Sequence, residues 1–289
     1  MPDLAILSQV ILSGIFIGFI YALVSVGLTV IYGVMDIVNF AHGEYLMLSM
    51  YVVFWLYALF RIDPIFGLPV SVLVLFVVGV LTHKLIVRPV LDAPMSAQIF
   101  VTFGLLVFLQ GVAQFLWSPS YRLIQEPLLS GRLQVAGLNV SLAQGVAAIG
   151  ALLTTAFVYW FIEKTETGRA LQAVAEDRQA ASLMGINSDR MFALAWGIGA
   201  ACVGVAGALL ANYYYIFPTV GTVFALIAFV AVALGGFGSV PGALVAGIII
   251  GLVEVLSGFF IAPAYKEVTV FALYLVVVLV RPQGLLGEW

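Results

Sequence analysis

The sequence predicts an all-α integral membrane protein with about nine transmembrane or re-entrant helices. Of its 289 residues, 64% are apolar and only 9% are charged, whereas soluble globular proteins carry roughly 45–50% apolar and about 25% charged residues. The apolar stretches are continuous rather than alternating, and many reach the ~20 residues that a helix needs to cross ~30 Å of hydrocarbon. Because lipid offers no partner to backbone N–H and C=O groups, such stretches are expected to be helices.

Proline, glycine and charged residues divide the apolar sequence into spans. The expected spans are residues 8–33, 45–60, 66–87, 96–116, 140–161, 191–215, 223–238, 241–261 and 265–281. The first follows an acidic rather than a basic start, so we expect a retained helix and not a cleaved signal peptide. Spans 45–60 and 223–238 are short and follow polar or Gly/Pro-containing breaks, which is typical of discontinuous helices that begin inside a membrane.

The two halves of the sequence resemble each other. Each opens with a helix rich in small residues, SGIFIGFIYALVSVG and GIGAACVGVAGALLANYYY, followed by a break and a short apolar segment. With nine spans the two units enter the membrane from opposite faces, as in inverted-repeat transporters, although chance similarity of apolar helices is the alternative. Small residues also recur every four positions, which predicts tight helix packing within one subunit rather than a dimer interface. These stripes are Gly14, Gly18 and Ala22; Ala200, Gly204 and Ala208; and Ala243, Gly247 and Gly251.

The distribution of basic residues predicts the orientation. If segment 162–190 is cytoplasmic, seven of the eleven basic residues lie inside, which favours a periplasmic N-terminus and a cytoplasmic C-terminus in a bacterial inner membrane. The inside group is Lys84, Arg88, Lys164, Arg169, Arg178, Arg190 and Arg281. A net charge of −3 provides no basic surface for nucleic acid. The single cysteine, Cys202, excludes an intrachain disulfide.

An unusually polar stretch, DIVNFAHGEY, joins the first two spans. An ionisable side chain in a membrane costs roughly 2.5–3.5 kcal/mol on insertion scales, so it normally faces protein or water. We expect Asn39, His42 and Glu44 to share a wet lining that borders the substrate path or its gate. Gly43 permits a bend or close backbone approach between them. The alternative is that these groups satisfy neighbouring helix ends, or that His42 and Glu44 satisfy one another.

Other polar residues lie inside predicted spans. Glu254 falls in the middle of GIIIGLVEVLSG, and a structural hydrogen bond is the expectation, with a place on the substrate path as the alternative. Gln110 and Gln114 share one helix face and are expected to bond neighbouring helices.

The sequence GGFGSVPG at 235–242 predicts a tight turn, with Pro241 suited to a helix start.

The longest charged stretch, EKTETGRALQAVAEDRQAASLMGINSDR, covers residues 163–190. Its periodicity predicts a short amphipathic helix at the membrane surface. The polar stripe is Arg169, Gln172, Glu176 and Gln179, and the opposite face is Leu171, Val174 and Ala175. The segment either rests at the interface with its charges in water or docks into a cytoplasmic partner.

Within this segment, TGRALQAVAEDRQAASLMGI resembles the permease subunits of branched-chain amino acid ABC importers of the LivH type. The stretches YALVSVGLTVIYGVMDIVNFAHGEYLMLSMY, GGFGSVPGALVAGIIIGLVE and RPQGLLG follow the same family pattern in the same order. The resemblance implies a type II-like ABC importer permease, a single domain over residues 1–289 with a coupling segment at 163–190. It also implies two ATP-binding subunits, a second permease that is LivM-like or identical, and a periplasmic binding protein as partners.

By this resemblance the candidates for contact with the ATPase are Arg169, Glu176, Asp177, Arg178 and Gly185. The chain has no GxxxxGK[ST] motif to hold nucleotide phosphates, so ATP and Mg²⁺ are expected on partner chains and no cofactor on this one. It also lacks HExxH and GxSxG motifs, which argues against an enzyme. Two alternatives remain: an importer of urea or short-chain amides, and an autonomous carrier that senses a coupling ion through Glu44 or Glu254.

Overall fold

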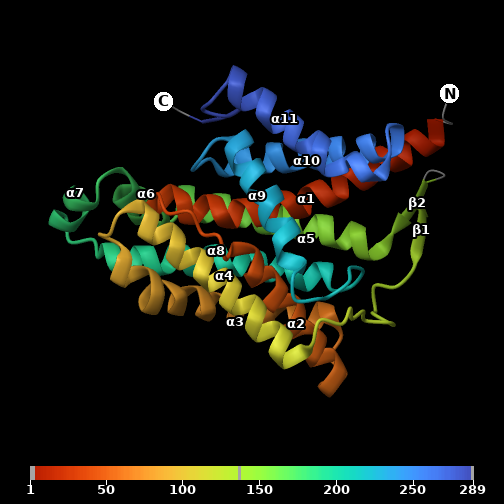
Figure 1. Cartoon of the computed structure of the whole chain (residues 1–289), viewed down its shortest axis with the longest axis horizontal. Coiled ribbons are helices and arrows are strands. Elements are labelled where there is room, and N and C mark those ends of the chain that lie inside the picture. The colour runs from red at the N-terminus through yellow and green to blue at the C-terminus, as the bar shows by residue number, and fades with distance from the viewer. Residues whose placement is uncertain (1–3, 136–137, 288–289) are drawn as a thin grey trace.

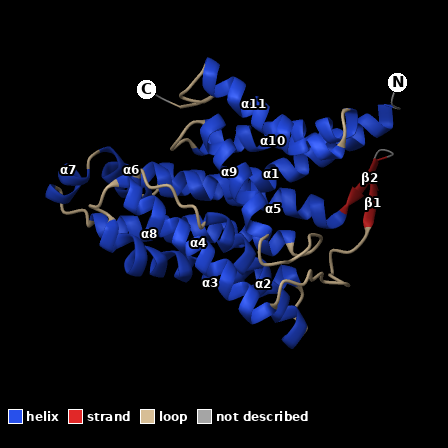
Figure 2. Ribbon diagram, in the orientation of Figure 1, coloured by secondary structure: helices blue, strands red, loops and turns tan. Residues whose placement is uncertain are grey.

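The computed structural model describes residues 4–135 and 138–287, and most of this chain is helical (Figure 2). The long helices are α1 Leu4–Met35, α2 His42–Phe60, α3 Pro64–Thr82, α4 Met95–Trp117, α5 Leu142–Lys164, α8 Ser188–Leu210, α9 Val220–Gly235, α10 Val240–Phe260 and α11 Lys266–Val280. The shorter helices are α6 Glu166–Glu176, α7 Arg178–Leu183 and the single turns His83–Val87, Arg88–Val90 and Pro263–Tyr265. Strands β1 Arg132–Val135 and β2 Leu138–Ser141 pair antiparallel, with Arg132 opposite Ser141.

Each of the nine expected spans coincides with an apolar helix in the described chain. Eight helical segments of the described chain are long and apolar enough to cross a membrane, and the last of them combines the turn Pro263–Tyr265 with α11. Helix α9, at 16 residues, is shorter than these segments. The span expected at 191–215 ends earlier, at Leu210, because the chain turns there and the Asn212 amide donates to the carbonyl groups of Ala208 and Leu209. The β1–β2 hairpin was not predicted from the sequence.

Capping side chains set where several helices begin. Asp63, Thr165, Asp177, Asn187 and Ser239 each accept a hydrogen bond from a backbone N–H in the first turn of the helix that follows. These N–H groups have no partner within their own helix, so a capping oxygen stabilises the helix start by about 1 kcal/mol. The starts of α3, α6, α7, α8 and α10 are therefore encoded locally.

The helices form a bundle with two distinct ends (Figure 1). Helices α6 and α7 lie at one end, and the N-terminus and the β1–β2 hairpin lie at the other. The C-terminal segment returns to the α6–α7 end, where the N–H groups of Leu285 and Leu286 donate to the carbonyls of Leu234 and Gly235 at the end of α9. Helices α1 and α8 are the most buried spans, and α4 and α11 lie at the periphery.

Segment 163–190 forms two helices rather than the single helix expected. The chain leaves helical geometry at Asp177, which caps α7. As predicted, Leu171 and Val174 are buried, but Ala175 is exposed. Val174 packs with Ala181 of α7 in a small cluster that fixes both helices onto the start of α8.

Helix contacts support the internal repeat. The two most extensive pairings are α1 with α10 and α3 with α8. If α1, α2 and α3 of the first unit correspond to α8, α9 and α10 of the second, the α1–α10 pairing corresponds to the α8–α3 pairing. By the same correspondence, α2–α3 matches α9–α10, and α1–α9 matches α8–α2. The two pairings in each match are of similar extent. Because α1 runs toward the α6–α7 end and α8 runs away from it, the two units are inverted.

The small-residue stripes pack within the subunit, as predicted. A Cβ on Gly18 of α1 would lie 2.8 Å from the Cα of Ile248 on α10, and one on Gly79 of α3 would lie 2.7 Å from the Cβ of Ala200 on α8. Contacts this close exclude larger side chains. The small-residue stripes of α1 and α10 therefore pack against each other, and the stripe of α8 packs against α3.

Two reciprocal glycine contacts join the repeats. A Cβ on Gly27 would lie 2.6 Å from the carbonyl oxygen of Gly199, and the reverse distance is also 2.6 Å. Gly43 and Gly221 approach more closely still, so that a Cβ on either would overlap the carbonyl group of the other. Since Gly43 and Gly221 are both second residues of their helices, α2 and α9 meet at their N-termini.

Replacing Gly43 or Gly221 by alanine is expected to destabilise the fold. The added methyl group overlaps a backbone carbonyl that cannot rotate away, and overpacking of this kind costs about 1–3 kcal/mol. Thermal unfolding of the purified chain in detergent measures the effect. Gly104→Ala and Gly111→Ala on α4 are the controls, because a Cβ there meets nothing within 4 Å. Equal melting temperatures for the two pairs would contradict the contact.

Candidate functional site

Helix α2 begins deep inside the bundle. The ring Nε2 of His42, its first residue, lies 2.9 Å from the carbonyl oxygen of Val24 on α1. Val24 precedes the end of α1 at Met35 by eleven residues, which is ~16 Å of helix. Segment 36–41 therefore runs back along α1 before α2 starts. This supports the prediction that the second span is a discontinuous helix.

Asn39 shapes the turn that leads into α2. Its side-chain oxygen accepts a hydrogen bond from the N–H of Ala41 at 3.1 Å, and its carbonyl accepts one from the N–H of His42 at 3.2 Å. Asn39 is fully buried. Its side chain replaces backbone hydrogen bonds that the irregular segment lacks, which is a usual role for asparagine in turns.

His42 ties α2 to α1. A carbonyl oxygen only accepts, so Nε2 carries the proton and donates it to Val24, and Nδ1 is left as an acceptor with no partner among the described residues. Gly27 leaves room for the ring, because a Cβ there would lie 3.2 Å from its Cε1. The hydrogen bond and the missing side chain together fix the start of α2 against the middle of α1.

Glu44 belongs to a second polar group, formed by three helices. Its Oε1 accepts a hydrogen bond from Nε2 of Gln110 on α4 at 2.9 Å, and the same nitrogen donates to the hydroxyl of Thr222 on α9 at 2.9 Å. Glu44 is 0% exposed, and its Oε2 has no partner in the part of the chain that the structure describes. Gln110 thus links the three helices, which confirms its predicted role.

Glu44 lies beside the N-termini of two helices. Glu44 and Thr222 each follow one of the touching glycines, Gly43 and Gly221, so they lie in the first turns of α2 and α9. A helix N-terminus carries a partial positive charge of about half an elementary charge. Two such ends meet here, and discontinuous helices of transporters commonly direct their N-termini at anionic groups of the substrate.

The polar stretch does not form the single shared lining that we expected. Residues two apart on a helix project roughly 200° apart, so His42 faces α1 while Glu44 faces α4 and α9. The suggested pairing of His42 with Glu44 is also wrong, for the same reason. Asp36 is exposed and ends α1 with a left-handed backbone angle of 53°. A border on the substrate path stays a prediction for Asn39, His42 and Glu44.

Glu254 makes the structural hydrogen bond expected of it. Its Oε2 accepts from the hydroxyl of Tyr21 at 2.6 Å, which joins α10 to α1. The Tyr21 ring lies 5.9 Å from that of Phe224 on α9, so this pair adjoins the start of α9. Gln114, which was expected to bond a neighbouring helix, is exposed.

Several coupling candidates have local structural roles. Asp177 caps α7, and Gly185 has a backbone φ of 85° in the turn that follows α7. The Arg178 guanidinium lies 3.3 Å from the Asp92 carboxylate and over the Phe192 ring at 5.3 Å, so it holds α7 against its neighbours.

The remaining coupling candidates, Arg169 and Glu176, are exposed at the α6–α7 end of the bundle, and so are two apolar residues of α7 and the turn after it. Arg169 and Glu176 are exposed on α6. Leu183 and Met184 at the tip of α7 are 87% and 82% exposed, and they are not among the residues predicted from the sequence. Thr222 and Tyr21 were also missed, because no local sequence signal reports the distant partners to which they bond. The apolar pair at 183–184 was visible as a break in an otherwise polar segment.

Within residues 4–135 and 138–287, nine apolar helices, an inverted repeat and two discontinuous helices that meet inside the bundle are the architecture of a multi-pass membrane permease. The family described as branched-chain amino acid transport system / permease component matches residues 10–279, and the chain belongs to this family. It is therefore a permease subunit of an ABC importer, as the sequence resemblance implied.

Named relatives align over nearly the whole chain. The high-affinity branched-chain amino acid transport system permease protein LivH of Escherichia coli K12 is 34% identical, with 97% of this chain and 95% of the relative covered. BraD of Pseudomonas aeruginosa, from a system of the same description, is 30% identical with 100% and 98% covered. A solved structure of PsaBC from Streptococcus pneumoniae in complex with Fab aligns over 94% of this chain and 92% of its own, with a TM-score of 0.47 and 12% identity.

If the Glu44 carboxylate borders the substrate path, Glu44→Gln is expected to lower uptake at least ~10-fold, which corresponds to about 1.4 kcal/mol in the barrier. The substitution keeps the size of the side chain and an acceptor for Gln110, so thermal stability should change little. Uptake into proteoliposomes and the melting temperature are measured together. Glu254→Gln is the matched control, since the Glu254 carboxylate accepts the hydrogen bond of the Tyr21 hydroxyl. Uptake by Glu44→Gln equal to that of the wild type would leave Glu44 a structural role alone.

Proposed function

We propose that this permease moves branched-chain amino acids across the bacterial inner membrane by alternating access. In this proposal it forms the path together with a second, LivM-like or identical permease. Two ATP-binding subunits drive it, and a periplasmic binding protein delivers the cargo. The observation that carries the substrate assignment is the end-to-end alignment with relatives named as permeases of high-affinity branched-chain amino acid systems. High-affinity selection then belongs to the binding protein, since a path must release what it carries.

Charge supports an orientation in which the α6–α7 end is cytoplasmic. Arg88 pairs with Asp189 at the start of α8, and Arg178 lies on α7 beside Asp92, so both arginines belong to this end. The hairpin end carries the smaller basic group, namely Arg61, Arg122, Arg132 and Lys266. Basic residues remain on the cytoplasmic side of bacterial membranes. The N-terminus is then periplasmic and the C-terminus cytoplasmic.

The α6–α7 segment is the proposed contact with the ATPase. It protrudes from the bundle (Figure 1), and the apolar side chains of Leu183 and Met184 at its tip are exposed. Exposed apolar side chains that cluster on a protruding element commonly mark an interaction site. Glu176 and Arg169 add charge beside them. ATP with Mg²⁺ would bind and react on the partner, whose closure would push this segment.

The double variant Leu183→Ser and Met184→Ser is expected to weaken assembly with the ATPase. Burial of such a side chain contributes about 1.5–3 kcal/mol, so affinity should fall at least ~10-fold. Co-purification of the subunits and ATPase stimulation measure the loss. The control is Leu128→Ser, which removes a side chain 66% exposed at the hairpin end. Unchanged co-purification of the double variant would refute the docking surface.

Uptake of leucine by the reconstituted assembly is expected to require ATP hydrolysis. With the ATPase subunits and binding protein present, replacing ATP by a non-hydrolysable analogue should reduce uptake to background. An ion gradient across vesicles that contain the permease alone should drive none. Leucine uptake in that second condition would favour an autonomous carrier. Uptake of urea but not of leucine by the complete assembly would favour the amide importer.

A further inference from the structure

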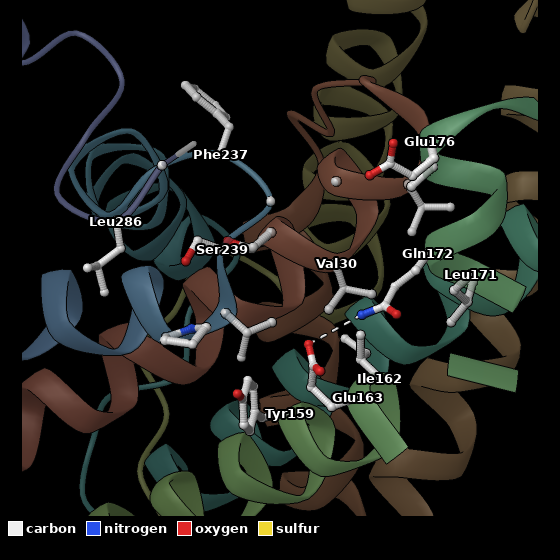
Figure 3. A pocket seen from close by; sticks show the side chains of 18 of the residues that line it. Val30, Tyr159, Ile162, Glu163, Leu171, Gln172, Glu176, Phe237, Ser239 and Leu286 are labelled. Carbon is white, nitrogen blue, oxygen red and sulfur yellow. Dashed lines mark hydrogen bonds between the residues drawn. The ribbon is translucent and has the colours of Figure 1, made fainter. Parts of the chain in front are cut away.

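The coupling segment, residues 163–190, is packed against the bundle on one side and faces open space on another. A cavity of about 760 Å³ lies between α6 and the turn from α9 to α10, where Glu176 stands opposite Ser239 (Figure 3). On the packed side, Phe192 at the start of α8 belongs to the same apolar cluster as Val174 of α6. A push on the segment is therefore transmitted through side chains of α8, and not across the cavity.

The ring of Phe192 contacts both α7 and the end of α3. The guanidinium of Arg178 on α7 lies over this ring, with its Cζ 5.3 Å from the ring centroid. The imidazole of His83 meets the same ring edge to face, with 6.2 Å between the ring centroids. Arg178, Phe192 and His83 therefore form one chain of contacts from the coupling segment to the end of α3.

His83 begins a change of helical geometry. Helix α3 continues beyond Thr82 as the π-helical turn His83–Val87, after which the N–H of Arg88 donates to the carbonyl of His83, five residues back. A π-turn holds one residue more than an α-turn, and such turns are frequent at functional sites. If the extra residue moved into the preceding turn, His83 would shift by one helical position, which is a rotation of about 100°.

Buried polar groups without partners gather beside this turn. His83 is fully buried, and neither of its ring nitrogens has a hydrogen-bond partner among the described residues. On α2, the hydroxyl of the fully buried Tyr45 lies beside the side chains of Asn39 and Thr82, yet neither this hydroxyl nor Nδ2 of Asn39 has a partner in the described chain. An imidazole offers one donor and one acceptor, which complement these two groups. An arrangement that joined them would gain hydrogen bonds that the present one lacks.

We propose that His83 is a positioning residue that couples α7 to the start of α2, through movement of the π-turn by one residue. In this movement His83 takes the place of Thr82, the residue before it. It then bonds Tyr45 and Asn39. Tyr45 directly follows Glu44, and Asn39 shapes the turn into α2, so the new bonds act on the proposed path. The inference rests on the proposed function, because it takes the α6–α7 segment as the ATPase contact.

The push from α7 supplies the bias between the two arrangements. Closure of the ATPase would press Arg178 and Phe192 against the imidazole of His83 and destabilise its present position. The second position differs by a whole residue of helix, so the element has two discrete states and not a continuous range. A partner shifts such an equilibrium only through contacts that differ between the states, and the contact of Phe192 with His83 is of this kind.

The number of ATP molecules hydrolysed per leucine imported tests the movement, measured on the complete assembly in proteoliposomes. His83→Phe keeps a ring against Phe192 but has no nitrogen to bond, so this number should rise about tenfold as the second arrangement loses its hydrogen bonds. Tyr45→Phe removes the bonding hydroxyl and should act in the same way. His83→Gln keeps one donor and one acceptor and should restore the wild-type number.

Thermal unfolding separates positioning from support of the fold. A buried polar group without a partner does not stabilise the present arrangement, so His83→Phe and Tyr45→Phe should melt no lower than the wild type. Their co-purification with the ATPase should also be unchanged. Lower melting temperatures in both variants, with an unchanged number of ATP molecules per leucine, would assign His83 a structural role and overturn the proposal.

The first link of the chain is tested by Phe192→Leu, which should raise the same number. Asp92→Asn breaks the ion pair of Arg178 but leaves its guanidinium over the ring, and should not raise it. Phe260→Leu is the matched control. It removes an edge-to-face contact with Phe259, with centroids 5.1 Å apart, at the C-terminal end of α10.

The same measurements distinguish the relay from the proposed function. Absence of ATP-driven leucine uptake by the wild-type assembly would refute the proposed function. Normal uptake by the wild type, with a wild-type number of ATP molecules per leucine in His83→Phe, Tyr45→Phe and Phe192→Leu, would refute the relay alone.

Discussion

The contact between Gly43 and Gly221 is the constraint on which the rest of the structure depends. It brings the N-termini of α2 and α9 together inside the bundle, at corresponding places in the two inverted units. Any side chain there would overlap a backbone carbonyl group, so both positions require glycine. The irregular segments before α2 and α9 must then lie within the protein, and buried irregular backbone needs polar partners. This accounts for the placement of Asn39 and His42 directly before and at the start of α2.

The same contact explains why a membrane protein with so few charges has a fully buried carboxylate. Two helix N-termini supply partial positive charge, and Gln110 donates to Glu44 from a third helix. Glu44 therefore has a hydrogen-bond donor and two helix N-termini beside it, rather than a basic residue. Glu254 differs, because its partner is the hydroxyl of Tyr21, a hydrogen bond that joins α10 to α1. The two carboxylates therefore differ in their surroundings: Glu44 lies beside two helix N-termini, and Glu254 strengthens the pairing of α1 and α10.

Helix α1 connects the coupling segment, residues 163–190, to the contact between α2 and α9. Helix α6 packs against α1, and α1 carries the carbonyl of Val24 that receives the His42 hydrogen bond. Movement of α6 relative to the bundle would therefore act on the helix to which the start of α2 is bonded.

The sequence by itself determined the nine helices, the two discontinuous segments, the small-residue stripes and the family, because these follow from composition, local spacing and motifs. It also predicted the bonding role of Gln110 and the structural role of Glu254, since a buried polar group must find a partner. Only the tertiary structure decided who the partners are: Val24 for His42, Tyr21 for Glu254, and Thr222 with Gln110 beside Glu44. It also placed His42 and Glu44 on different faces of α2. Those arrangements depend on how helices far apart in sequence cross, and no local pattern records the geometry of a crossing.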